Sequence, residues 1–272
     1  MRSRLLLVSV PLAVALTGAL AGCGSSSKGP GPDTGGGTAA GTGQSTTGGA
    51  SLKGSITVFA AASLTGTFTT IGDQFKAAHP GTKITFNFGA SSALATQINQ
   101  GAPADVFASA APKNMDQVKD KGTPSTFATN TAEIAIPPSN PGHVTRLSDL
   151  AKSGVKVALC QDQVPCGVVA AAVFSKAHVT VKPVTREADV KSTLAKVTAG
   201  EVDAGVVYVT DVKAAGSKVK GITIPNNVNA STDYPIATLT GTKNSDLAAA
   251  FVAYVESADG QAVLTAAGFG KP

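Results

Sequence analysis

The 272-residue sequence has no tryptophan, only three cysteines and few charged side chains. Charged residues make up 14% of the chain, well below the roughly 25% of an average domain. Three cysteines cannot supply a multi-cysteine structural zinc site, and 5% aromatic residues disfavour a single-stranded nucleic-acid platform of stacked rings. The 43% of hydrophobic residues excludes a wholly disordered chain. The length suits one large or two medium domains.

The chain also lacks any run of basic residues, although its net charge is +5. Arg2 and Arg4 belong to an N-terminal segment that we expect to be removed, and without them 20 basic residues stand against 17 acidic ones, a net charge of +3. The remaining basic residues are scattered along the sequence. A nucleic-acid partner is therefore not expected.

Residues 1–22 have the pattern of a secretory signal: two arginines, an apolar stretch from Leu5 to Leu16, and small residues before Cys23. The ending Leu-Ala-Gly-Cys resembles the lipobox of bacterial lipoproteins, in which the cysteine is lipidated and becomes the new N-terminus. We therefore expect an extracytoplasmic protein anchored to the cell membrane through a lipid on Cys23. An ordinary secretory signal cut nearby is the alternative. Residues 23–52 then form a flexible linker, because ten of residues 24–50 are glycine and their only apolar side chains are three alanines.

The other two cysteines, Cys160 and Cys166, are separated by five residues. An even pair in an oxidising compartment favours a disulfide. A reactive or metal-binding thiol pair is the alternative, although no histidine lies near them in the sequence. A loop this short gives a modest stabilisation, about 2 kcal/mol, so the bond would chiefly shape one loop.

From residue 55 onward, short apolar runs alternate with stretches of helical periodicity. The expected strands cover 55–61, 83–89, 104–110, 133–138, 156–161, 203–209 and 234–239, and the expected helices cover 64–79, 93–101, 113–122, 147–154, 168–177, 186–200 and 244–268. This alternation predicts an α/β fold with mostly parallel sheets, in two lobes of about 220 ordered residues together. Ligands of such sheets bind at the carboxyl ends of the strands.

Serines and small residues stand where several of these strands pass into helices. Ser63 follows one strand, Ser91 and Ser92 follow the next, and Glu187 to Val190 open a later helix. Helix N-termini carry unpaired N–H donors and a partial positive charge, so several that converge would hold an anion without lysine or arginine. The simpler interpretation is that these residues only cap their helices.

A set of motifs carries a resemblance to a known family. VFAAASL, FGASSALATQI, GAPADVF, VPCG, READV and GVVYVTD occur in this order, and together they resemble the periplasmic molybdate-binding proteins of ABC transporters from about residue 54 to residue 272. The resemblance implies a two-lobed type II periplasmic-binding fold whose lobes are joined by two hinge strands. Lobe 1 would comprise 53–134 and 237–272, and lobe 2 would comprise 135–236.

The resemblance also implies a ligand set for an oxyanion. Ser63 and Ser91 would donate through hydroxyl and backbone N–H, Cys166 and Val190 through backbone N–H, and Tyr208 through its phenol. Cys166 departs from the small residue usual in the family, and a backbone donor tolerates that change. Ser92 is a possible additional ligand.

The expected function is the capture of molybdate or tungstate and its delivery to a membrane permease, by a monomer without enzymatic activity, cofactor or bare metal-ion site. A sulfate-binding or other tetrahedral oxyanion-binding protein of the same fold is the alternative. An enzyme acting on an anionic substrate would need a general base. The nearest acids, Asp105 and Asp189, are more simply structural, as a capping or paired acid and as a first-turn helix acid.

Overall fold

The computed structural model describes residues 52–272, which form part of one compact unit. The predicted signal segment 1–22, the predicted lipidation site Cys23 and the predicted linker up to residue 51 lie outside the described residues. Within residues 52–272, no helix has the length and apolar character needed to cross a membrane.

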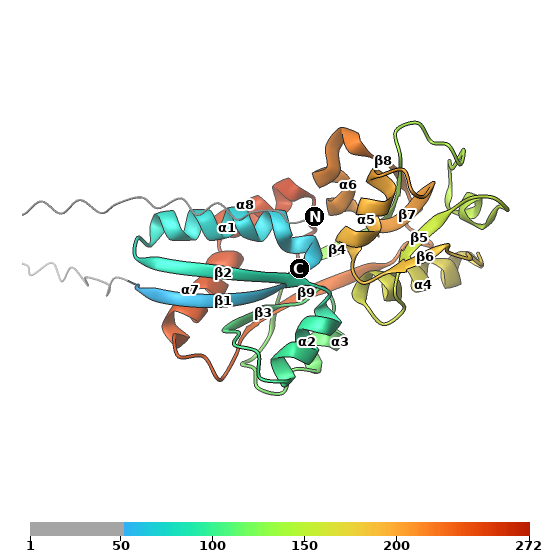
Figure 1. The fold of residues 1–272 in the computed structure, drawn as a ribbon. Helices are drawn as coiled ribbons and strands as arrows, with labels where there is room; N and C mark the ends of the chain where they lie inside the picture. Colours follow the sequence, from blue (N-terminus) through green and yellow to red (C-terminus); the bar gives the residue numbers. More distant parts are fainter. Residues whose placement is uncertain (1–51) are drawn as a thin grey trace, which may run out of the picture. The chain divides into compact units, whose positions relative to one another are not determined.

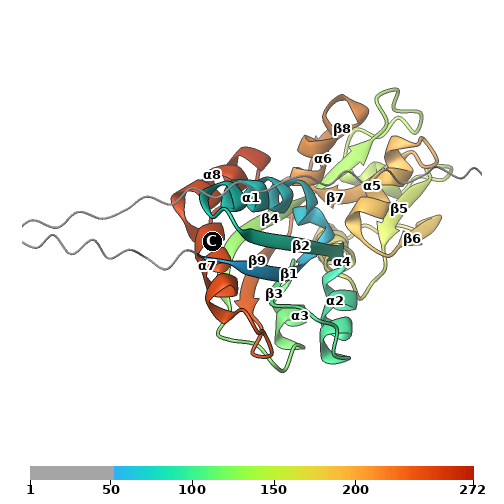
Figure 2. The ribbon, with the colours of Figure 1, turned by 60° about the vertical axis from the view of Figure 1, so that its left-hand side comes forward.

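The first group of elements surrounds three parallel strands. Strand β1 pairs in parallel with β2 on one side and with β3 on the other. The strands and helices of this group are β1 (Gly54–Ala61), α1 (Thr65–Ala78), β2 (Thr82–Gly89), α2 (Ser91–Asn99), β3 (Val106–Ala108), α3 (Pro112–Asp116), α7 (Ser245–Glu256) and α8 (Ala258–Ala267). Figures 1 and 2 show α1 beside α8 on one face of these strands. Helices α2 and α3 lie side by side, away from α1 and α8.

The second group repeats this plan around β5, which lies in parallel between β6 and β7. Its elements are β5 (Val157–Cys160), α4 (Pro165–Ala177), β6 (Thr185–Glu187), α5 (Val190–Thr198), β7 (Ala204–Tyr208), α6 (Val209–Ala215) and β8 (Lys220–Thr223). A 3-10 helix, Leu147–Ala151, precedes β5.

Two long strands, β4 (Ser125–Ile136) and β9 (Ser231–Thr238), connect the two groups. They pair with each other in antiparallel fashion, and β9 also pairs with β3 while β4 pairs with β7 and β8. The strand order is therefore β2-β1-β3-β9-β4-β7-β5-β6, with β8 on β4. Figure 1 shows the first group at one end of these strands and the second group at the other.

Each group has its own hydrophobic core. The first is rich in aromatic rings: Phe68 and Phe75 of α1 meet Phe251 of α7 edge to face at 6.1 and 5.6 Å. A smaller cluster under α2 and α3 covers the other face of the same strands. The second core is aliphatic, built mostly from valine, leucine, isoleucine and alanine. We call the two groups lobe 1 and lobe 2; their residue boundaries stay a prediction.

The alternation of strands and helices follows the sequence prediction, with local corrections. Strand β4 begins at Ser125 rather than at residue 133, because β9 offers it a long antiparallel partner. The helix expected from residue 186 begins at Val190, since Thr185–Glu187 pair with β5 as a strand. The expected C-terminal helix is two helices, separated at Ser257, whose hydroxyl caps the second one.

Four smaller differences concern short segments. The expected helix 113–122 is shortened to α3, and the expected helix 147–154 is a 3-10 helix. Helix α6 and strand β8 have no counterpart in the prediction. Segments this short are set by tertiary contacts more than by periodicity, since few residues sample the repeat.

Candidate functional site

The five residues Ser63, Ser91, Cys166, Val190 and Tyr208 all line one cavity. Its remaining lining comes from the same strand-to-helix junctions of both lobes: Ala61, Ala62, Gly89, Ala90, Ala110, Val164, Pro165 and Asp189. The cavity volume is about 20 Å³, whereas pockets for organic ligands measure roughly 300–1,000 Å³. The cavity therefore suits a ligand of only a few atoms.

Lobe 1 contributes two buried serine side chains. Ser63 lies in the 3-10 turn Ala62–Leu64 between β1 and α1, and Ser91 is the first residue of α2 after β2. The Ser91 hydroxyl oxygen accepts a hydrogen bond from the backbone N–H of Ala110 at 2.9 Å. With its oxygen engaged in this way, the hydroxyl hydrogen of Ser91 is free to point into the cavity.

Lobe 2 contributes helix N-termini. Cys166 is the second residue of α4, behind Pro165, and Val190 is the first residue of α5. Backbone N–H groups in a first helical turn have no acceptor within their own helix, and the helix dipole makes both positions favourable for negative charge. The side chains of Cys166 and Val190 therefore matter less here than their backbone positions.

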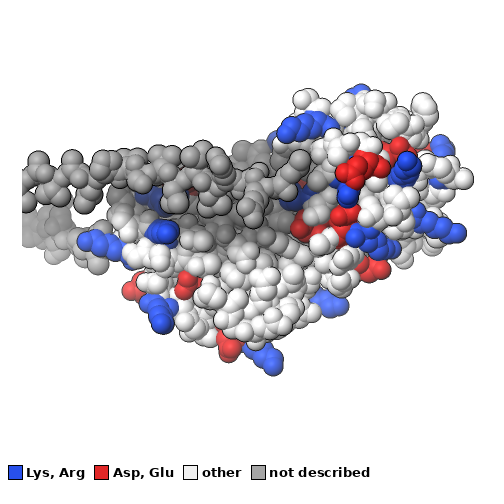
Figure 3. Space-filling model, viewed as in Figure 1, with Lys and Arg blue, Asp and Glu red and all other residues white. Residues whose placement is uncertain are grey.

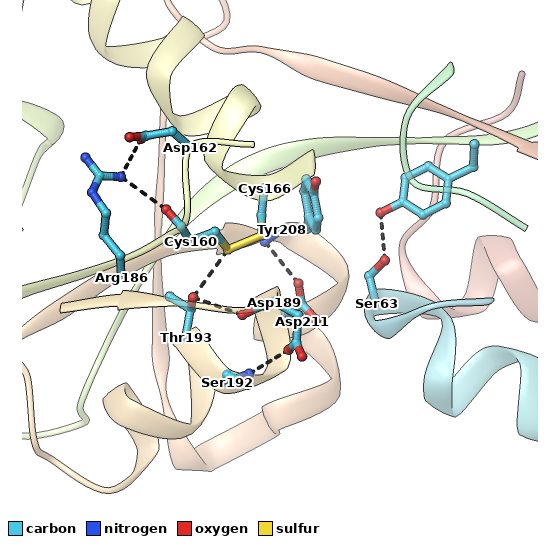
Figure 4. Close-up of a disulfide and its surroundings, with 11 residues drawn as sticks. Ser63, Cys160, Asp162, Cys166, Arg186, Asp189, Ser192, Thr193, Tyr208 and Asp211 are labelled. Atoms are coloured by element: carbon cyan, nitrogen blue, oxygen red, sulfur yellow. Dashed lines mark hydrogen bonds and ion pairs between the residues drawn. A yellow bond between two sulfur atoms is a disulfide. The ribbon is translucent and has the colours of Figure 1, made fainter. Parts of the chain in front are cut away.

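Cys166 is joined to Cys160 at the end of β5 by a disulfide, with 5.8 Å between the Cα atoms. The bond ties the carboxyl end of a central strand to the first turn of α4, next to the cavity (Figure 4). The Cys160 sulfur also lies 3.3 Å from the hydroxyl of Thr193 in α5. Both helix N-termini of the cavity are thus held to the same strand end.

Tyr208, the last residue of β7, is the third hydroxyl at the cavity. It is 1% exposed, and its phenol oxygen has no hydrogen-bond partner among the described residues. Burial, followed by the neighbouring Tyr234 and Asp211, raises the pKa of the Tyr208 phenol well above its ordinary value of 10. The phenol is therefore a protonated donor at neutral pH, and a ligand oxygen would satisfy it.

The backbone of Tyr208 is fixed by a buried carboxylate. Asp211 accepts a hydrogen bond from the Tyr208 N–H at 3.1 Å, and its other oxygen lies 2.9 Å from the Lys191 ammonium of α5. Burial raises the pKa of Asp211, while Lys191 and the Tyr208 N–H lower it. This ion pair links β7 and α6 to α5 behind the cavity.

Among the described residues, the cavity lining contains no lysine or arginine. Its one carboxylate is Asp189, whose Oδ1 accepts the Ser192 N–H at 2.9 Å as the N-cap of α5. Asp189 was expected as an acid of the first helical turn; it stands one position earlier, where it caps the helix. On the face in Figure 3, lysines and arginines are spread over the surface and mixed with acidic residues.

The structure separates other predicted residues from the cavity. Ser92 lines a neighbouring groove with Gln163, and it is not part of the cavity lining. Asp105 is structural, as expected, because it accepts the Thr57 N–H at 2.7 Å and a hydrogen bond from the Thr242 hydroxyl. Within residues 52–272 no group of three or more His, Cys, Asp or Glu residues could hold a metal ion.

A second layer of polar residues lies behind the cavity, and no sequence pattern predicts it. The Tyr234 hydroxyl on β9 lies 2.8 Å from the Ser63 hydroxyl, and the Asn130 amide on β4 lies 3.4 Å from the Tyr234 oxygen. Asn130 also donates to Thr210 in α6 at 2.8 Å. These residues are distant in sequence, and no local motif marks them.

Two lobes joined by two strands, with a small cavity of donors at the strand ends between them, are the architecture of a solute-binding protein. The family model described as bacterial extracellular solute-binding protein matches residues 56–270. The chain belongs to this family.

Relatives and solved structures agree with this assignment. The chain is 43% identical over 222 residues to the molybdate-binding protein ModA of Mycobacterium bovis, covering 80% of this chain and 85% of that protein. It is 31% identical over 230 residues to a Bacillus subtilis protein named as a candidate ABC transporter substrate-binding lipoprotein, covering 80% and 86%.

Two solved structures share the fold. The periplasmic molybdate-binding protein of Azotobacter vinelandii gives a TM-score of 0.72 at 21% identity, covering 80% of this chain and 99% of that one. The sulfate-binding protein SubI of Mycobacterium tuberculosis gives a TM-score of 0.69 at 17% identity, covering 79% and 86%. The predicted two-lobed α/β fold is confirmed.

Proposed function

We propose that this protein captures molybdate or tungstate between its lobes and delivers the anion to the membrane permease of an ABC transporter. One observation carries the proposal: three buried hydroxyls and two helix N-termini surround a single cavity of about 20 Å³ that has no cationic side chain in its lining. The name of the 43% identical Mycobacterium bovis relative supports the choice of anion.

The chemistry of the lining fits a fully deprotonated oxyanion. Such an anion only accepts hydrogen bonds, and Ser63, Ser91 and Tyr208 can each donate one while the first-turn amides of α4 and α5 donate more. Hydrogen bonds from uncharged donors to a charged group are worth about 1.5–3 kcal/mol each. Neutral donors and helix dipoles can therefore hold a dianion without a buried lysine or arginine.

The remaining parts of the proposal concern the setting of the protein. We propose that Cys23 carries a lipid anchor and that the glycine-rich linker holds the two lobes outside the membrane; the lipoprotein name of the Bacillus subtilis relative supports this. The protein works as a monomer that binds and releases its solute unchanged, which fits a solute-binding family.

Sulfate is the second candidate, because it is also a dianion that only accepts hydrogen bonds, and the fold is shared with a sulfate-binding protein. Phosphate is a further anion to test, because a protonated phosphate oxygen can donate a hydrogen bond to a carboxylate. Asp189 is the one carboxylate that the described residues place in the cavity lining. The engagement of Asp189 in capping α5 favours the unprotonated anions.

Isothermal titration calorimetry of residues 51–272 with molybdate, tungstate, sulfate and phosphate tests the proposal. We expect saturable binding of molybdate and tungstate at one site per chain and no heat with sulfate or phosphate. Binding of sulfate without any binding heat for molybdate would assign the alternative function. The absence of binding heat for all four anions would refute an oxyanion receptor.

A further inference from the structure

The hydrogen bonds behind Ser63 start from a donor whose direction is fixed. A backbone N–H can only donate, and that of Thr131 donates to the Asn130 side-chain oxygen at 3.1 Å. This contact fixes which end of the Asn130 amide is the NH₂ group, and that group lies 2.8 Å from the Thr210 hydroxyl and 3.4 Å from the Tyr234 hydroxyl. Asn130 is therefore the donor to Tyr234.

The direction continues to the cavity. Because the Tyr234 oxygen accepts from Asn130, its own hydrogen is available for the Ser63 oxygen at 2.8 Å. Burial raises the pKa of Tyr234, so the phenol keeps this hydrogen at neutral pH. When the Tyr234 hydrogen lies on the Ser63 oxygen, the Ser63 hydrogen is left to point toward the cavity that Ser63 lines.

We propose that Tyr234, oriented by Asn130, is a positioning residue that fixes the Ser63 hydroxyl as a donor toward the bound anion. The inference rests on the proposed function, since it assumes an anion in the cavity. An unconstrained hydroxyl can present either its hydrogen or its lone pairs, and lone pairs facing an anion would repel it.

The other serine of lobe 1, Ser91, has a backbone N–H behind its hydroxyl instead of a side chain. The Ser91 oxygen accepts from the backbone N–H of Ala110, a donor that no substitution at position 110 other than proline removes. The Ser63 oxygen depends on a side chain 171 residues further along the chain. Of the two serines, Ser63 is thus the one whose hydrogen-bond partner is removed by the loss of a single side-chain hydroxyl.

The position of Tyr234 also connects the lobes. It lies on β9 and Asn130 lies on β4, the two strands shared between the lobes, and Asn130 also donates to Thr210 of α6 in lobe 2. Figure 4 shows Ser63 with its tyrosine partner in the same view as Tyr208 and the disulfide of lobe 2. The orientation of a lobe 1 ligand group is thus set at the hinge.

Tyr234 also packs in the core, with its ring centroid 5.3 Å from Phe269 and 6.2 Å from Phe127. The variant Tyr234→Phe keeps this ring and removes only the hydroxyl. A purely structural role would lower the melting temperature and leave the dependence of affinity on Ser63 unchanged, so a double-mutant cycle separates the two roles.

The experiment measures Kd for molybdate and tungstate by calorimetry in wild type, Tyr234→Phe, Ser63→Ala and the double variant. We expect Tyr234→Phe to weaken binding about tenfold and the same change in the Ser63→Ala background to weaken it less than twofold. The matched control Tyr254→Phe, whose ring packs against Phe75 away from the cavity lining, should change Kd less than twofold.

A second arm reverses the direction of the hydrogen bonds. In Asn130→Asp the ionised side chain can only accept, so the Tyr234 hydrogen turns toward residue 130 and Ser63 must donate to Tyr234 instead of to the anion. We expect a loss larger than that of Tyr234→Phe, and a loss at least threefold smaller when Asn130→Asp is made in the Tyr234→Phe background. The added negative charge acts equally in both backgrounds, so the difference isolates the hydroxyl.

The outcomes separate this inference from the proposed function. A wild-type protein that binds neither anion overturns both. A wild-type protein that binds, together with independent effects of Tyr234→Phe and Ser63→Ala or with an unchanged Kd in Tyr234→Phe, overturns the positioning role alone.

Discussion

The two lobes line the same cavity with different chemistry. Lobe 1 presents the hydroxyls of Ser63 and Ser91, which hydrogen-bond behind the cavity to the Tyr234 hydroxyl and to the backbone N–H of Ala110. Lobe 2 presents the first turns of α4 and α5, held by a disulfide and by the ion pair of Lys191 with the buried Asp211, and adds the phenol of Tyr208, which has no partner within residues 52–272.

This difference separates side-chain identity from backbone position. A hydroxyl is lost by one substitution, whereas a backbone N–H survives most substitutions and is lost only when the helix moves. Cys166 illustrates the point, because its side chain is used in a disulfide while its backbone still lies in the first turn of α4. Lobe 1 should therefore be sensitive to the residue at a position, and lobe 2 to what holds its helices.

The largest effect should come from displacing a helix of lobe 2. A Cβ added at Gly167, next to Cys166, would stand 1.9 Å from the backbone oxygen of Gln161. We expect Gly167→Ala to destabilise the protein by about 3 kcal/mol, the upper part of the usual range for overpacking, and to abolish anion binding. Urea unfolding and calorimetry measure both.

The control for Gly167→Ala is Gly66→Ala in α1 of lobe 1, where an added Cβ meets no atom within 4 Å. There we expect unchanged affinity and a stability that is equal or higher, by up to about 1 kcal/mol. Normal binding by Gly167→Ala would contradict the importance of the α4 backbone.

The buried ion pair of lobe 2 gives the next effect. Lys191→Met leaves the carboxylate of Asp211 buried without its partner, and we expect a loss of about 3 kcal/mol in the free energy of unfolding. Without Lys191 the pKa of Asp211 rises further, so the folded state binds a proton more tightly than the unfolded state. The loss should therefore grow as pH rises from 5 to 8.

Urea unfolding at pH 5 and pH 8 measures this dependence. Lys196→Met on the same helix is the control, because Lys196 pairs with the exposed Glu201 and such pairs add little. Equal losses for the two lysine variants, or a loss independent of pH, would show that the Lys191–Asp211 pair is unimportant.

A smaller effect distinguishes the lobes at the cavity itself. Ser63→Ala and Ser91→Ala in lobe 1 should each weaken molybdate binding by about 1–3 kcal/mol, as expected for a lost hydrogen bond to a charged group. Val190→Ala in lobe 2 keeps the backbone N–H and should change the binding free energy by less than about 0.5 kcal/mol. Ser92→Ala, outside the cavity, should do the same. A loss of binding free energy in Val190→Ala as large as that of the serine variants would contradict the proposed difference between side-chain donors in lobe 1 and backbone donors in lobe 2.

The smallest effect concerns pH. Burial raises the pKa of Tyr208 well above 10, so its phenol should remain a donor throughout the neutral range. We expect the Kd for molybdate to stay constant from pH 6 to pH 9, and Tyr208→Phe to weaken binding equally across that range. A fall in wild-type affinity centred below pH 9 that Tyr208→Phe abolishes would show that the phenol ionises earlier.

The sequence predicted much of this site because its chemistry is local. A serine after a short strand, or a proline and a glycine around Cys166, identify a strand-to-helix junction within a few residues. The resemblance to a family then selected Val190 and Tyr208, which composition and periodicity do not single out. The full length of β4 was missed, because its first half is specified by pairing with β9 about a hundred residues away.

The sequence by itself determined the alternation of the main strands and helices, the residues at their junctions and the pair of cysteines, because each depends on neighbours along the chain. Only the tertiary structure decided that five of those residues share one cavity, that Ser92 does not line it, and that Asn130 and Tyr234 lie behind the Ser63 hydroxyl. The physical reason is that a hydrogen bond has a direction only once both partners are placed. Here the partners lie 104 and 171 residues apart and meet where the two lobes share their strands.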